Sequence, residues 1–91
     1  QARQEAVARF VAEGDALLDL LGDDGADRAE QLRRAHRFLG ACGLFGGRSL
    51  LREVQALERE LEAGALPPTL PGRIAAEWAA LRQAVLHHLG A

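Results

Sequence analysis

The chain of 91 residues has a formal net charge of −2, and 48% of its residues are hydrophobic. These values are typical of one small globular domain and give no reason to expect nucleic-acid binding. Its single cysteine, Cys42, excludes an internal disulfide framework, and its apolar runs are too short to span a membrane. We therefore expect one cytoplasmic domain over residues 1–91, with no membrane contact of its own.

The first predicted helix covers residues 3–21, where apolar residues recur at spacings of three and four. Gly14 lies inside this helix at an energetic cost, and we expect it to permit close approach of another helix. After a turn, the second predicted helix covers residues 26–42. Asp24 is its expected N-cap, and Asp27 is placed near its positive end.

Glycines follow the second helix, and we expect Leu44 and Phe45 among them to pack into the end of the molecule. The third predicted helix covers residues 48–63 and ends at Gly64, because glycine is favoured just past a helix and two prolines follow. The fourth covers residues 70–89.

The fourth helix has an apolar stripe that runs from Ile74 to Leu89, with Thr69 as its expected N-cap. Trp78 on this stripe is expected to anchor the core, and Cys42 of the second helix is expected to be buried. Four amphipathic helices with short connections predict an all-α fold, an antiparallel up-down four-helix bundle.

His36 lies at the edge of the apolar arc of the second helix. A helical wheel puts five residues on that arc: Leu32, Ala35, Phe38, Leu39 and Cys42. Arg33, Arg34 and Arg37 point away from it. Gly40 follows His36 by one turn, so its missing side chain leaves room beside the imidazole. A histidine next to a gap, with cationic neighbours, favours an anion that approaches the ring.

The segment His36-Arg37-Phe38-Leu39-Gly40, followed by Gly46 and by Leu50-Leu51 and Leu57-Glu58, resembles the signature of the histidine phosphotransfer (HPt) domain. That pattern is His, any residue, Leu, Lys, Gly, a further Gly six residues on, and then an amphipathic helix. The resemblance covers the whole chain in helix order, with the specific motif confined to residues 35–58.

The resemblance implies a four-helix bundle in which His36 accepts a phosphoryl group from a receiver-domain aspartate and passes it to another receiver. It also implies a monomeric module of a hybrid sensor histidine kinase. No glycine-rich nucleotide loop is present, so we expect no kinase activity from the module itself. We expect no bound cofactor, because the Mg²⁺ ion of such a relay is held by the carboxylates of the receiver.

Leu39 stands where the family has lysine. Guanidinium groups bind phosphoryl oxygens well, so Arg33 or Arg37 is a candidate to supply the missing charge. Arg48 and Arg52 of the third helix are candidates to extend the same basic face toward an acidic receiver.

The sequence is compatible with two other functions. A non-catalytic interaction or dimerisation bundle, an HPt relative that has lost transfer, is compatible with Leu39. The phosphoacceptor domain of a chemotaxis-type kinase would require further domains downstream. His87 and His88 lie in the last turn, where the helix dipole explains them, and no metal site is expected because histidines at the spacing of an i, i+4 pair are absent.

Overall fold

The computed structural model describes residues 2–90, and all regular structure within that range is helical. The four main helices are α1 (Ala2–Leu21), α2 (Arg28–Cys42), α3 (Arg48–Glu62) and α4 (Leu70–Val85). A 3₁₀ turn, η1 (Gly43–Phe45), follows α2, and a π-helical turn, η2 (Leu86–Gly90), follows α4. The predicted all-α fold class is therefore confirmed.

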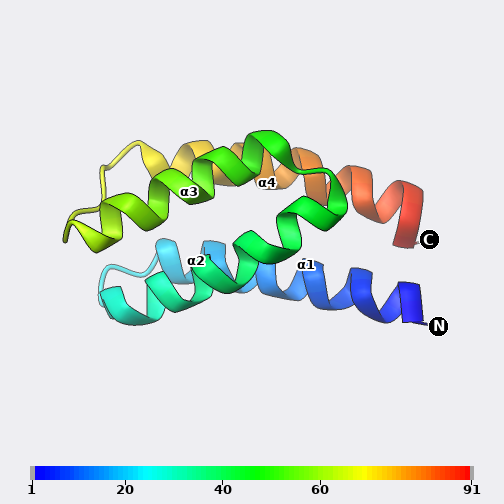
Figure 1. Ribbon diagram of the computed structural model, residues 1–91, viewed down its shortest axis with the longest axis horizontal. Coiled ribbons are helices and arrows are strands. Elements are labelled where there is room, and N and C mark those ends of the chain that lie inside the picture. The colour runs from blue at the N-terminus through cyan, green and yellow to red at the C-terminus, as the bar shows by residue number, and fades with distance from the viewer. Residues whose placement is uncertain (1, 91) are drawn as a thin grey trace.

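The helices form a four-membered bundle in which consecutive helices run in opposite directions along the long axis (Figure 1). Each helix contacts the next one in the chain, and α1 also contacts α4, so the ring of helices is closed. The molecule measures 39 × 20 × 19 Å. Both ends of the chain lie at one end of the bundle, and the α1–α2 and α3–α4 loops lie at the other (Figure 1).

The core is built from the predicted apolar stripes and is centred on aromatic rings. Phe10 stacks on Phe38 and Phe45, with ring centroids 5.3 and 4.3 Å away. Trp78 meets Phe10 and Phe38 edge to face, at 5.3 Å from each. These are the offset and T-shaped arrangements that aromatic quadrupoles prefer. Cys42 and Trp78 are both buried, as the sequence predicted.

The α1 and α4 helices are joined by a close contact and a polar cluster. Gly14 is buried against the Trp78 indole, and a methyl group at Gly14 would lie 2.3 Å from the ring. The indole N–H of Trp78 donates to Asp15 Oδ1 at 2.9 Å, and Arg82 donates to both Asp15 oxygens at 3.0 and 3.1 Å. The expectation that Gly14 permits close helix approach is confirmed.

The start of α2 differs from the prediction. The helix begins at Arg28 with Asp27 in the N-cap position, two residues later than expected, and Asp24 is not the cap. The preceding residues form a turn instead, in which Asp23 Oδ1 accepts the Gly25 N–H and the Asp23 carbonyl accepts the Ala26 N–H. Asp side chains favour such local turns over helix interiors.

The end of α3 agrees with the prediction to within one residue. Gly64 adopts a left-handed φ of 86°, and the Ala65 N–H donates to the Glu60 carbonyl at 2.9 Å. The Gly64 N–H donates to the Leu61 carbonyl at 3.0 Å. This pair of bonds satisfies carbonyls that have no partner within the helix, and it stops the helix where glycine was expected to do so.

Two further expectations near the helix ends are wrong, and a third holds for position alone. Leu44 is 84% exposed, and only Phe45 packs into the core. The α4 helix ends at Val85, and the wider η2 turn rotates the following residues, so Leu89 is 38% exposed. Thr69 occupies the N-cap position of α4 without a side-chain bond to the backbone, and its hydroxyl instead accepts a bond from Arg73 at 3.4 Å.

Within residues 2–90, none of the helices is both long enough and apolar enough to cross a membrane.

Candidate functional site

The surface between α2 and α3 carries His36, whose side chain is 79% exposed. Its core-facing neighbours Ala35 and Phe38 are buried and fix that stretch of α2. The Nδ1 atom of His36 lies 2.8 Å from Oε2 of Glu58 on α3, a carboxylate whose side chain is only 18% exposed. Because a carboxylate oxygen accepts, Nδ1 is the donor. In the neutral ring the lone pair then lies on Nε2, which makes no hydrogen bond within residues 2–90.

The position of Gly40 leaves space one helical turn beyond His36. A Cβ atom built at Gly40 would meet no other atom within 4 Å, and the residue is exposed. Leu39 is partly buried and packs against the core, as its place on the wheel predicted. Its side chain therefore stabilises the bundle, and the open approach to His36 is on the Gly40 side.

The candidate arginines differ in their surroundings. Arg33 and Arg34 both pair with Glu30 on the same helix, Arg34 at 3.0 Å. Arg37 is exposed and forms no ion pair within residues 2–90. Arg33 and Arg37, the two candidates to bind phosphoryl oxygens, thus flank His36 in the sequence. Arg33 is bound to a carboxylate, and Arg37 forms no ion pair within residues 2–90.

Arg48 and Arg52 are both exposed on α3. Since α2 and α3 are antiparallel and His36 faces Glu58, the residues that precede Glu58 lie on the Gly40 side of the histidine. Residues 37–52 contain three arginines and no acidic residue. The α2 and α3 residues on this side of His36 therefore carry a net positive charge, although Glu77 of α4 lines the same hollow as Arg48.

An open groove extends from His36 in the opposite direction, toward the loop end of the bundle. It is lined from α2 by Ala29, Leu32, Arg33 and His36, and from α3 by Glu58 and Glu62. Its α3 side carries two carboxylates and its α2 side carries Arg33, so the surface on this side of His36 holds acidic groups that residues 37–52 lack.

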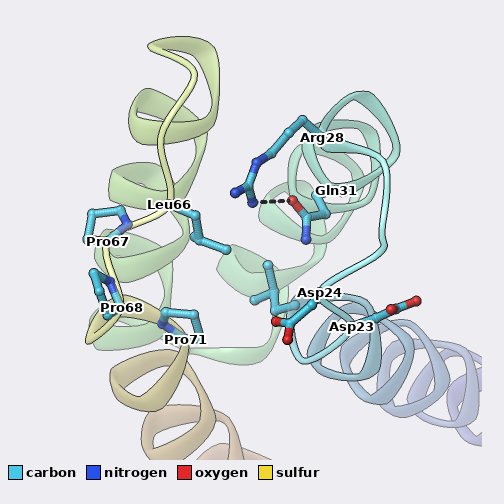
Figure 2. A pocket seen from close by; sticks show the side chains of 9 residues that line it. Asp23, Asp24, Arg28, Gln31, Leu66, Pro67, Pro68 and Pro71 are labelled. Carbon is cyan, nitrogen blue, oxygen red and sulfur yellow. Dashed lines mark hydrogen bonds between the residues drawn. The ribbon is translucent and has the colours of Figure 1, made fainter.

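A second hollow lies between the two loops at that end of the bundle, and Figure 2 shows its lining. Leu66 and three prolines form one side, and Arg28 and Gln31 face them. Arg28 donates to Gln31 at 3.0 Å, and Gln31 in turn donates to the Leu20 carbonyl at 3.2 Å. These polar groups tie α2 to the end of α1, and the lining holds the carboxylates of Asp23 and Asp24 but no histidine, cysteine or serine.

The remaining reactive side chains have structural explanations. Burial raises the pKa of the Cys42 thiol to about 12, which keeps it protonated and unreactive at neutral pH. The exposed rings of His87 and His88 contact each other edge to face, with centroids 4.8 Å apart. Over the described part of the chain, no cluster of histidine, cysteine and acidic residues is arranged to hold a metal ion.

The contact of Glu58 with His36 was not predicted from the sequence. Glu58 was part of the motif that suggested the family, yet nothing assigned it to His36, which is 22 positions away. The signal available was its place beside Leu57, a buried core position, which puts Glu58 on the flank of α3. Only the packing of α2 against α3 decides which α2 residue that flank meets.

Comparison with known proteins gives no match: no family model fits the chain, and no curated protein or solved structure is significantly similar to it. The functional interpretation therefore rests on the geometry around His36.

Proposed function

We propose that the chain is a histidine phosphotransfer module, which accepts a phosphoryl group on His36 from a receiver-domain aspartate and passes it to another receiver. The observation that carries the proposal is the exposed imidazole whose Nδ1 is held by Glu58 while Nε2 makes no hydrogen bond within residues 2–90. A histidine in the core or in a metal site would lack this free nitrogen. Within the proposal the module is a cytoplasmic part of a hybrid sensor histidine kinase.

Glu58 selects the reactive form of the ring. Its carboxylate accepts the Nδ1 proton, so the neutral imidazole keeps its lone pair on Nε2. The same contact fixes the orientation of the ring, because Glu58 is mostly buried and therefore restrained. A positioned neutral imidazole is a competent nucleophile near pH 7.

In the transfer step, the Nε2 lone pair attacks the phosphorus atom of the receiver's aspartyl phosphate. The N–P bond forms while the P–O bond to the aspartate breaks, and the aspartate leaves as a carboxylate. The proton on Nδ1 stays in its bond to Glu58, so the positive charge that develops on the ring faces a carboxylate. The reverse sequence passes the group to the next receiver.

The surroundings of His36 suit this step. The open space at Gly40 admits the phosphoryl group and the acidic edge of a receiver, and the arginines of residues 37–52 attract both. Arg37 is free to bind phosphoryl oxygens. Arg33 becomes available by leaving Glu30, which Arg34 still holds. Leucine at position 39 is then compatible with transfer, because arginine supplies the positive charge.

The test is to mix the domain with receivers of its source organism, each carrying an aspartyl phosphate, and to measure acid-labile, base-stable label on the domain. Wild-type protein should take up label, and His36→Gln should take up less than a hundredth of it, since glutamine has no nucleophilic nitrogen. The double variant His87→Gln/His88→Gln is the matched control and should be labelled like the wild type. Label that persists in His36→Gln would refute the proposal.

A further inference from the structure

The groove beside His36 has a chemistry that phosphoryl transfer itself does not use. Its apolar lining consists of the exposed Ala29 and the partly buried Leu32, and its α3 side carries Glu58 and Glu62 one helical turn apart. Glu58 is occupied by His36. Glu62 is exposed and forms no ion pair within residues 2–90, so its charge is available to a partner.

Arg33, the arginine of the groove lining, is not paired with Glu62. Its guanidinium is bound to Glu30 on the same helix, and in the proposed transfer step it moves from Glu30 to the phosphoryl group, so in neither case does it pair with Glu62. An incoming cationic side chain therefore meets a carboxylate on Glu62 that has no ion-pair partner within residues 2–90, beside the apolar Ala29 and Leu32. This combination suits a side chain with an apolar stem and a positive end.

His36 thus sits at a boundary in surface charge. On its Gly40 side, residues 37–52 contribute arginines and no acid, whereas the groove on its other side offers Glu62. A receiver that presents its acidic phosphorylation site over Gly40 must place the neighbouring part of its own surface over the groove. The charge of Glu62 requires that neighbouring part to be basic if the two surfaces are to be complementary.

We propose that Glu62 and the groove determine which receiver docks, and in which orientation: the groove holds an apolar side chain of the receiver, and Glu62 pairs with a lysine or arginine beside it. This inference rests on the proposed phosphotransfer function and adds a specificity site to it. Neither Glu62 nor Ala29 takes part in the chemistry at His36.

The experiment uses the receiver that labels His36 fastest and measures the initial rate of transfer against receiver concentration. For Glu62→Lys we expect KM to rise about fivefold, because an exposed attraction becomes a repulsion, while kcat changes less than twofold. The difference in KM should shrink in 0.5 M salt, because salt screens exposed charges. Ala29→Leu, which narrows the groove, should raise KM at either salt concentration.

Glu60→Lys is the matched control. Glu60 belongs to the same last turn of α3 but lies about 200° away around the helix and does not line the groove. This variant makes the same change in net charge and should leave KM at the wild-type value. Chemical phosphorylation of His36 by phosphoramidate should proceed equally in all of these variants.

The outcomes separate the two proposals. If wild-type protein accepts label and Glu62→Lys has the wild-type KM, or if Glu60→Lys raises KM equally, the groove assignment is overturned while phosphotransfer stands. If no receiver labels His36, the proposed function itself fails.

Discussion

Two sides of the bundle each place a glycine inside a helix, and the consequences are opposite. On the α1–α4 side, Gly14 is closed off by the Trp78 indole, and the adjacent Asp15 binds both Trp78 and Arg82. On the α2–α3 side, Gly40 is open and stands next to the exposed His36. Both glycines cost helix stability relative to alanine.

The difference shows what a helical glycine can be used for. At Gly14 the missing side chain allows two helices to approach, and the cost is offset by aromatic packing and by a satisfied indole N–H. At Gly40 no packing offsets the cost within residues 2–90, because a Cβ atom there would meet no other atom within 4 Å. Under the proposed function, the first side therefore stabilises the fold and the second side recognises the receiver.

The largest expected change in stability is for Gly14→Ala. The new methyl group would lie 2.3 Å from a buried ring that is held by Phe10 and Phe38, so the α1–α4 contact must open. Overpacking of this kind costs about 3 kcal/mol, and the gain in helix propensity returns about 1 kcal/mol. Urea unfolding followed by circular dichroism should show a net loss of about 2 kcal/mol. A variant as stable as the wild type would contradict this account of Gly14.

Asp15→Ala should destabilise the fold by about 1–2 kcal/mol, because it leaves the buried Trp78 N–H without an acceptor. Asp15→Asn is the control, because its amide oxygen can still accept that bond, and it should lose less. Equal losses in the two variants would show that the indole bond is not the source of the effect.

The same cluster predicts a pH dependence. The bond from Arg82, followed by the bond from Trp78, lowers the pKa of the Asp15 carboxyl despite some desolvation. Because the folded pKa is below the unfolded value of about 3.9, the stabilisation is present above that pH and is lost as the pH falls through the folded pKa. The effect is small, since the Asp15 and Arg82 side chains are 43% and 40% exposed. Acid unfolding of Asp15→Asn should lack this component.

The smallest expected change in stability is at Gly40. Gly40→Ala should raise the free energy of unfolding by about 1 kcal/mol, because the new methyl group meets no other atom and the helix penalty disappears.

Gly40→Leu should keep its helicity and yet lose at least about tenfold in the rate of phosphoryl transfer, because the side chain fills the approach to His36. Circular dichroism measures the helicity, and the transfer assay on the same samples measures the rate. A folded Gly40→Leu variant with normal transfer would contradict the assignment of this side to recognition.

Features that depend on a single helix could be predicted from the sequence. The apolar stripes gave the four helices, and the wheel placed Leu39 toward the core and Gly40 toward solvent. Contacts between helices were not predictable in this way. The His36–Glu58 bond and the Asp15–Trp78 bond join residues 22 and 63 positions apart, and both depend on the rotation and register of packed helices. The shift in the start of α2 arose because Asp23 formed a turn that competed with the helix.

The central claim is that Glu58 holds Nδ1 of His36 so that Nε2 accepts the phosphoryl group. The most direct test is a ¹⁵N–¹H correlation spectrum of protein labelled at the histidine ring nitrogens, recorded before and after incubation with a phosphorylated receiver. We predict that His36 carries its proton on Nδ1 beforehand and a phosphorus atom on Nε2 afterwards, with His87 and His88 unchanged. Phosphorus on Nδ1, phosphorus on either terminal histidine, or no phosphorylation at all would contradict the account.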